Sequence, residues 1–382
     1  MTERILRAPA HELRRSHTSL KWRAHPSDVL PLWVAEMDCE PCPAVVTAVS
    51  GAMRRGDTGY PWTADFTEAF TSFAATQWNW HVDPRTGVVV ADVLSGIARL
   101  LETLTDHAAP VVLSSPVYNA FFTVIDSLGR KPLDAPLTPD GRLDPESLAD
   151  AFAQATTGGA RAAYLLSNPH NPTGTVHTSE ELETLARLAD RHGVTVISDE
   201  IHAALVYGAD SFTPYLTVPA AERGITVTSA SKAWNLAGLK AGLIVPGPEA
   251  RAAVGRLHRF VTLGASHLGV IAHTAAWTGG VDWVQRLVQE LDANRRLLAE
   301  LVADQLPGVR LRLPEATYLA WLDCGALDLG DDPSVRFRER GRVALSEGPS
   351  FGEGGRGCVR LNFATSPEIL REAVGRMAAS LD

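Results

Sequence analysis

The chain has 382 residues, a formal net charge of −9 and 45% apolar residues. That length is about two and a half times a typical domain and the composition is that of a folded protein, which excludes a disordered chain and a small disulfide scaffold. A net negative charge without a basic patch argues against a nucleic-acid partner. The sequence has no run of about 18 apolar residues, which argues against a membrane span.

The cysteine content points to a reducing compartment. The four cysteines do not form a disulfide framework, and the first 30 residues carry arginines without an apolar leader segment. We therefore expect a cytoplasmic protein. Cys39 and Cys42 have C-x-x-C spacing, but no second pair of cysteines or histidines follows at zinc spacing. We expect a prolyl turn there and no metal site.

The region from about residue 85 to 246 alternates short β-branched runs with helical patterns. Continuous apolar runs predict buried strands at 87–91, 110–113, 162–166, 194–198, 225–228 and 241–245. Helical spacing predicts helices over 145–155 and 179–192, the second with Ser179 as its N-cap. Strand, helix and strand in this repeated order predict an α/β fold with a mostly parallel sheet.

The pattern changes beyond this region. Apolar positions from 284 to 302 recur at helical spacing and predict one long amphipathic helix. Later runs predict the strands of a smaller α+β unit, closed by a helix over 367–381; these strand runs are 309–313, 318–322, 343–345 and 359–363. We place the domain boundary inside the long helix. This gives a large domain over 45–282 and a small domain formed by 1–44 plus 283–382.

Lysine is scarce in this chain. Of 35 lysines and arginines only four are lysines: Lys21, Lys131, Lys232 and Lys240. An arginine guanidinium stays protonated and cannot form an imine, so few residues are candidates for amine chemistry.

Polar segments follow three of the predicted strands, at the edge where open parallel sheets bind ligands. They combine an amide, an acid and an amine: Ser-Asn-Pro-His-Asn-Pro-Thr-Gly at 167–174, Ser-Asp-Glu-Ile-His at 198–202, and Ser-Ala-Ser-Lys at 229–232. An imine-forming lysine with a carboxylate from a neighbouring strand matches pyridoxal 5′-phosphate (PLP), whose pyridine nitrogen must stay protonated to act as an electron sink. Singly, Asp199 and Asn171 also fit turns, and Lys232 fits a helix start.

These motifs in this order, together with Arg-Leu-Asn-Phe-Ala at 360–364, resemble the fold-type-I, class I/II aminotransferase superfamily. The chain is most similar to its cystathionine β-lyase (C–S lyase) branch, from about residue 20 to the end. The resemblance implies a large PLP-binding domain with a mostly parallel sheet, and a smaller α+β domain built from the N- and C-terminal segments.

The resemblance also implies roles for individual residues. Lys232 is expected to attach the cofactor covalently and then to act as the base at the substrate's Cα. Asp199 is expected to pair with the pyridinium nitrogen. Asn171 and His202 are expected near the phenolic oxygen of the cofactor, and Tyr118 is expected to stack on its ring.

The remaining implied contacts concern the phosphate and the substrate. The phosphate is expected at a helix N-terminus, held by Ser229, Ser231, Lys240 and the backbone at Val93 and Leu94. Tyr60 is expected to reach the phosphate of the partner subunit, which implies a homodimer with shared active sites. The substrate carboxylate is expected on Arg360, assisted by Asn171 and the backbone near Ala35. Asp92 departs from the pattern, because relatives often have glycine beside the phosphate.

We therefore predict a PLP-dependent C–S β-lyase. It would eliminate a thiol from an L-cysteine-derived thioether such as cystathionine and leave pyruvate and ammonia. The alternative is a PLP-dependent aminotransferase that acts on an L-amino acid and a 2-oxo acid with the same residues. A third interpretation, a catalytically idle sensor on this fold, predicts bound cofactor without turnover.

Overall fold

The computed structural model describes residues 4–208 and 212–382, and the chain divides into two compact units. The small unit comprises Met1–Glu40, Asn171–Gly174 and Gln285–Asp382, and the large unit comprises Pro41–His170 and Thr175–Val284. One boundary falls inside the long helix α11 (Val281–Gln305). The grouping of Asn171–Gly174 with the small unit was not foreseen from the sequence, because that segment directly follows a strand of the large unit.

The large unit is built on a seven-stranded sheet with the order β2-β8-β7-β6-β5-β3-β4. Its strands are β2 (Val88–Val90), β3 (Val111–Leu113), β4 (Pro132–Asp134), β5 (Ala163–Ser167), β6 (Thr195–Asp199), β7 (Ile225–Thr228) and β8 (Gly242–Pro246). Neighbouring strands are parallel, except that β8 is antiparallel to both β2 and β7. The predicted mostly parallel sheet is confirmed.

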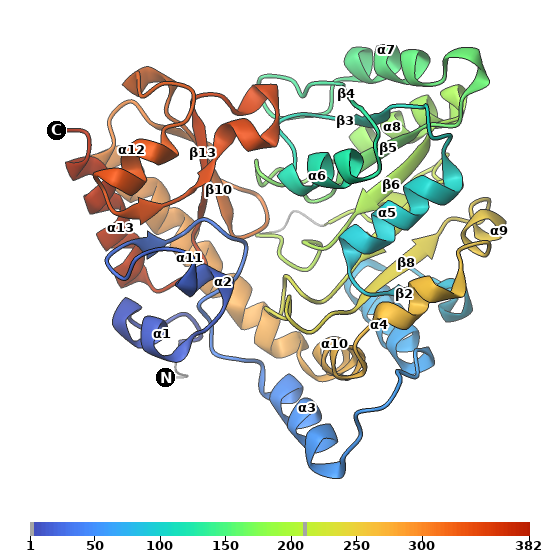
Figure 1. Cartoon of the computed structure of the whole chain (residues 1–382), viewed down its shortest axis with the longest axis horizontal. Coiled ribbons are helices and arrows are strands. Elements are labelled where there is room, and N and C mark those ends of the chain that lie inside the picture. The colour runs from blue at the N-terminus through green and yellow to red at the C-terminus, as the bar shows by residue number, and fades with distance from the viewer. Residues whose placement is uncertain (1–3, 209–211) are drawn as a thin grey trace. The chain divides into compact units, whose positions relative to one another are not determined.

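Both faces of this sheet are buried, which explains the continuous apolar runs. Successive residues of a strand point to opposite faces, and they enter two separate cores. Val112 and Tyr164 pack with helices α7 (Pro145–Ala155) and α8 (Ser179–His192). Val111 and Ala163 pack with α5, α6 and α9, which span Val93–Leu104, Asn119–Ser127 and Arg251–Val254. Figure 1 shows α7 and α8 apart from α5 and α6 in this unit.

The start of α8 corrects one prediction. The N-cap is Thr178, not Ser179: the Thr178 hydroxyl accepts a hydrogen bond from the N–H of Glu181 at 3.2 Å. The Glu181 carboxylate in turn accepts from the N–H of Thr178 at 2.7 Å. This reciprocal capping box needs Glu three residues after the cap, and that spacing selects Thr178.

Three further helices of the large unit pack together: α3 (Pro43–Arg55), α4 (Ala64–Trp78) and α10 (His267–Gly279). Trp277 of α10 contacts α4, with its ring 4.8 Å from that of Phe66 and 5.2 Å from that of Phe70. Cys42 is the N-cap of α3, followed by proline. The predicted prolyl turn is not found: residues 39–42 form an irregular segment that leads into α3.

The small unit has α+β architecture. A four-stranded sheet has the order β12-β13-β10-β9, and β1 pairs with β11 in a second sheet. Its strands are β1 (Leu30–Pro31), β9 (Arg310–Leu311), β10 (Leu319–Asp323), β11 (Val343–Ala344), β12 (Ser346–Glu347) and β13 (Cys358–Asn362). Its other helices are α1 (Ala10–Ser16), α2 (Leu20–Arg23), α12 (Ser334–Glu339) and α13 (Pro367–Ala379).

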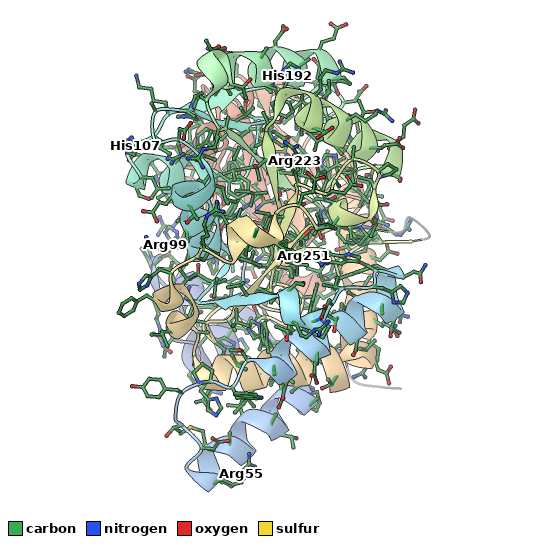
Figure 2. All side chains as sticks on the ribbon, turned by 90° about the vertical axis from the view of Figure 1, so that its right-hand side faces the viewer. Arg55, Arg99, His107, His192, Arg223 and Arg251 are labelled. Atoms are coloured by element: carbon green, nitrogen blue, oxygen red, sulfur yellow. The ribbon has the colours of Figure 1, made fainter. Side chains whose placement is uncertain are left out.

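Two surface arginines of the large unit form ion pairs with nearby glutamates. Figure 2 labels Arg99 and Arg223 on this unit, and both are exposed. Arg99 lies 2.5 Å from Glu102, and Arg223 lies 2.9 Å from Glu249. Within residues 4–208 and 212–382, no helix is both long and apolar enough to cross a bilayer. The same residues contain no group of three or more His, Cys, Asp or Glu side chains that could hold a metal ion.

Candidate active site

The large unit carries its polar segments at one edge of the seven-stranded sheet. Parallel strands β5, β6 and β7 end at Ser167, Asp199 and Thr228, so the segments after them begin at the same edge. Strand β8 runs the other way, and its first residue, Gly242, pairs with Val90 at the end of β2. The residues before β8 and after β2 therefore lie at this edge too, where open α/β sheets bind ligands.

Asp199 is a buried carboxyl group close to an amine. The residue is 5% exposed, and its Oδ1 accepts a hydrogen bond from the N–H of Ile201 at 3.1 Å. Burial raises the pKa of Asp199 to about 7, while that hydrogen bond and the charge of Lys232 act in the opposite direction. The two predicted residues are thus electrostatically coupled. A carboxylate in this position needs a cationic partner to stay ionised.

Lys232 lies in a turn between β7 and β8, not in a helix. The N–H of Trp234 donates to the carbonyl of Ala230 at 3.1 Å, and the N–H of Leu236 donates to the carbonyl of Ser231 at 2.8 Å. The interpretation of Lys232 as a helix-start cation is therefore wrong. Backbone hydrogen bonds fix the position of its Cα at the ligand edge of the sheet.

Hydrogen bonds connect the predicted phosphate-binding serines to the segment just before β8, which contains Lys240. The hydroxyl of Ser229 donates to the carbonyl of Ala241 at 2.8 Å, and it accepts from the N–H of Ser231 at 3.1 Å. Ala241 directly follows Lys240. These contacts bring three of the predicted phosphate ligands into one neighbourhood.

The first turn of α5, with the predicted Val93 and Leu94, lies against the start of β8. A Cβ atom added to Gly242 would lie 3.2 Å from the backbone nitrogen of Val93, so glycine permits this approach. Asp92 is the N-cap of α5, and its Oδ2 lies 2.9 Å from the Nζ of Lys240. A helix N-terminus and an ammonium group both favour an anion. In this chain the anion at that position is the carboxylate of Asp92.

The other predicted cofactor contacts of the large unit differ in their environments. His202 is 3% exposed, whereas Tyr60 is 92% exposed. Tyr118 is half-buried, and its ring lies 5.5 Å from that of Phe121 in the core. Tyr118 therefore combines a partly exposed ring with a core contact. The nearly full exposure of Tyr60 is unusual for an aromatic side chain.

Glu200 is a second buried carboxyl group, which the sequence analysis did not assign. Its Oε1 accepts hydrogen bonds from the hydroxyl of Ser198 at 3.0 Å and from the N–H of Tyr215 at 2.8 Å. Burial raises the pKa of Glu200 to about 8. The protonated side chain thus fastens the short helix η3 (Tyr215–Thr217) to the end of β6, next to Asp199.

In the small unit, Arg360 is held by four neighbours. Its Nη1 donates to Oδ1 of Asn171 at 3.0 Å, and its Nη2 donates to the carbonyl of Trp33 at 3.0 Å and to Oγ of Ser346 at 3.1 Å. The guanidinium carbon lies 4.9 Å from the centroid of the Phe351 ring. The side chain is therefore pre-oriented, as recognition of a carboxylate by the planar guanidinium requires. Sequence reasoning identified Arg360 and Asn171 and missed Ser346.

The backbone around the predicted Ala35 is also fixed by side chains. The hydroxyl of Tyr318 donates to the carbonyl of Ala35 at 3.0 Å. The amide of Asn362 donates to the carbonyl of Val34 at 2.8 Å. Because both carbonyls are engaged, the segment presents a defined backbone conformation.

A buried ion pair anchors the end of that segment. The Nζ of Lys21 lies 2.7 Å from Oδ2 of Asp38, and both side chains are buried. The indole N–H of Trp22 donates to Oδ1 of Asp38 at 2.8 Å. Removing one member of such a pair typically costs about 3–5 kcal/mol, because it leaves an uncompensated buried charge. Lys21, one of the four lysines, thus has a structural role in this buried ion pair.

The chain as a whole matches a known family of proteins. The chain belongs to the aminotransferase class I and II family, whose sequence model matches residues 27–377. It is 49% identical over 391 residues to a Mycobacterium tuberculosis (strain H37Rv) protein named "Putative cystathionine beta-lyase", covering 97% of this chain and 96% of that one. It is 34% identical over 381 residues to the cystathionine beta-lyase of Corynebacterium glutamicum, covering 98% and 100%.

A solved structure agrees with this placement. The crystal structure of the PLP-bound C–S lyase from Staphylococcus hominis matches with a TM-score of 0.89 at 27% identity, covering 96% of this chain and 97% of that chain. The predicted superfamily and its C–S lyase branch are confirmed. The individual site residues remain predictions, now placed in their two units.

Proposed function

We propose that this protein is a PLP-dependent C–S β-lyase that releases a thiol, pyruvate and ammonia from an L-cysteine-derived thioether such as cystathionine. The observation that carries the proposal is the buried Asp199 carboxyl coupled to Lys232 at the ligand edge of the sheet. The support from relatives is that full-length homologues carry the name cystathionine beta-lyase.

The residues of the large unit fit this cofactor. When bound, PLP supplies an electron sink for the negative charge that develops at the substrate's Cα. Asp199 would favour a protonated pyridine nitrogen, because a buried carboxylate is stabilised by an adjacent cation. Lys232 would hold the cofactor by its amine, and that amine would serve as the base that takes the proton from Cα. Ser229, Ser231, Lys240 and the first turn of α5 offer donors and positive charge to the phosphate.

The small unit supplies the substrate carboxylate site. The fork of Arg360 matches a carboxylate, and Asn171 assists it through the amide group that already contacts the guanidinium. The backbone near Ala35 completes this site. The other proposed cofactor contacts are Asn171 and His202 at the phenolic oxygen and Tyr118 on the ring.

We further propose a cytoplasmic homodimer in which Tyr60 reaches the partner's phosphate. The support is the 92% exposure of Tyr60 and the 72% exposure of Trp62 on the same segment. Aromatic side chains of this size are typical of interface contacts. All four cysteines are free thiols, in keeping with a reducing compartment.

One experiment tests the reaction. The purified, PLP-loaded enzyme is incubated with L-cystathionine, and separately with an L-amino acid plus 2-oxoglutarate. The lyase releases thiol and pyruvate from cystathionine without any 2-oxo acid. New amino acid formed only in the second mixture would identify an aminotransferase, and bound PLP with no product in either would identify a sensor. Lys232→Ala is the control and must abolish product formation.

A further inference from the structure

Asp92 and Lys240 form an ion pair at the proposed phosphate site. The carboxylate Oδ2 of Asp92 lies 2.9 Å from the Nζ of Lys240, and its Oδ1 accepts a hydrogen bond from the N–H of Ser95 at 2.8 Å. The Lys240 side chain is 56% exposed and that of Asp92 is 33% exposed. The pair therefore faces solvent on one side and the first turn of α5 on the other.

The position of Asp92 is set by the backbone. Asp92 directly follows the end of β2 and is the N-cap of α5, and a Cβ atom on Gly242 would lie 3.1 Å from the Asp92 carbonyl carbon. The start of β8, two residues after Lys240, thus lies against Asp92. Partial burial alone would raise the pKa of Asp92, but hydrogen bonds from Ser95 and Lys240 hold it below its ordinary value. Asp92 is therefore ionised at neutral pH.

A carboxylate in this place meets the same groups that a phosphate would meet. The helix N-terminus and the ammonium group of Lys240 both attract an anion, and a second anion brought to them is repelled by the first. We propose that Asp92 is a built-in competitor for the cofactor's phosphate, which weakens cofactor binding until Lys240 exchanges its carboxylate partner for the phosphate. This inference rests on the proposed function.

The exchange follows from the contacts on each oxygen. Oδ2 faces Lys240, whereas Oδ1 faces the N–H of Ser95. Lys240 can therefore turn to a phosphate while Asp92 continues to cap α5. The long, flexible lysine side chain permits this movement at little cost. The ion pair with Asp92 compensates the charge of Lys240.

Asp144 offers a matched comparison within the chain. It is the N-cap of α7, and its carboxylate accepts from the N–H of Glu146 at 3.1 Å and from the hydroxyl of Ser147 at 2.7 Å. Asp92 and Asp144 thus share the capping role, but the contacts of Asp144 are to an amide and a hydroxyl. A change from aspartate to asparagine removes the charge at either place and keeps a good N-cap.

The test measures cofactor affinity in the wild type, Asp92→Asn and Asp144→Asn. Each protein is stripped of cofactor and titrated with PLP and with pyridoxal, which lacks the phosphate, and binding is followed by absorbance. Asp92→Asn is expected to bind PLP about tenfold more tightly than the wild type and to bind pyridoxal equally well. Asp144→Asn is expected to match the wild type with both compounds. Equal PLP affinity of Asp92→Asn and wild type, or the same change with pyridoxal, overturns the proposal.

A second variant and a second measurement keep the proposal testable if Asp92→Asn does not fold. In that case Asp92→Ser is used in its place, because serine also offers an oxygen that caps the helix. Thermal unfolding of the cofactor-free proteins is then measured with inorganic phosphate, which should stabilise the Asp92 variant more than the wild type. Equal stabilisation overturns the inference. A failure of the proposed function is distinct from either result, since it is seen as loaded enzyme that releases no thiol or pyruvate.

Discussion

Arg360 and Asn171 are 189 positions apart in the chain, yet Nη1 of Arg360 donates a hydrogen bond to Oδ1 of Asn171 at 3.0 Å. The contact lies inside the small unit, because Asn171–Gly174 groups with the C-terminal strands. Gly174 fixes that segment: its carbonyl accepts from the N–H groups of Glu315 and Ala316, both at 2.9 Å. The loop that the sequence assigns to cofactor chemistry thus also contacts Arg360, the residue proposed to bind the substrate carboxylate.

Ser346 positions Arg360, and its removal should affect substrate binding more than turnover. Its hydroxyl donates to the carbonyl of Trp33 at 2.5 Å and accepts from Nη2 of Arg360 at 3.1 Å. Ser346→Ala is expected to raise KM for cystathionine about fivefold and to change kcat by less than about twofold, because a carboxylate is bound alike in substrate and transition state. Steady-state kinetics measures both. Ser16→Ala, which removes an exposed hydroxyl of the same unit, should change neither. A fall in kcat with unchanged KM would contradict this role.

Replacing Arg360 by lysine keeps the positive charge but removes the paired N–H donors of the planar guanidinium. Since two nitrogens of the guanidinium are already oriented by Asn171, Trp33 and Ser346, a single ammonium group cannot reproduce the arrangement. We expect Arg360→Lys to lower kcat/KM for cystathionine about 100-fold, roughly 3 kcal/mol of transition-state stabilisation. Arg310→Lys, at an exposed ion pair with Asp323, should leave kcat/KM unchanged. Wild-type kcat/KM in Arg360→Lys would remove Arg360 from the substrate site.

Much of the large unit could be predicted from the sequence, because strands that are buried on both faces have continuous apolar sequences, which are easy to recognise. Ala163–Ser167 is buried throughout and reads as one apolar run. The strand that was missed, Pro132–Asp134, lies at the sheet edge with its outer residues exposed, so it lacks such a run. An edge strand exposes more of its side chains to solvent, so its sequence contains fewer apolar residues and is harder to recognise.

The candidate site also contains residues that could be predicted from the sequence and residues that could not. Lys232 and Asp199 could be predicted because each belongs to a local motif whose residue types carry the chemistry. Ser346 could not, because its importance comes from cross-strand register with Arg360 and from a carbonyl 313 positions away. Likewise, the partner of Asp92 lies 148 positions away at Lys240. A carboxylate beside a phosphate site was visible in the sequence, but its ion pair depends on which strand lies next to β2.

Sharing of the active site between subunits can be tested by mixing two inactive variants. Lys232→Ala and Tyr60→Ala are each expected to be nearly inactive. If Tyr60 serves the partner's site, a mixed dimer has one site with both defects and one with none. Random re-pairing of equal amounts then restores about a quarter of wild-type activity. The control mixture is Lys232→Ala with Asp199→Ala, whose residues act in the same subunit and should show no recovery. Activity of the first mixture equal to the mean of its parents would contradict shared sites.

Glu200 should make the stability of the protein depend on pH in a defined direction. Burial raises the pKa of this side chain from its ordinary value to about 8. A carboxyl group whose pKa is raised by folding contributes stability that is present below its unfolded pKa and is lost as pH rises through its folded pKa. Glu200→Gln cannot ionise, and its carbonyl oxygen can still accept from Ser198 and Tyr215 as Oε1 does. Its free energy of unfolding relative to the wild type should therefore rise between about pH 5 and pH 8 and then level off.

The expected difference is roughly 5 kcal/mol at pH 9 in favour of Glu200→Gln, and it shrinks toward the acid end of the range. Urea denaturation of the PLP-loaded enzymes at a series of pH values measures it. Glu222→Gln is the matched control, because Glu222 is an exposed glutamate of the same unit. A flat difference for Glu200→Gln would mean that the buried carboxyl is ionised at neutral pH. It would then have to be stabilised by a cation beyond the hydroxyl and amide donors that surround it.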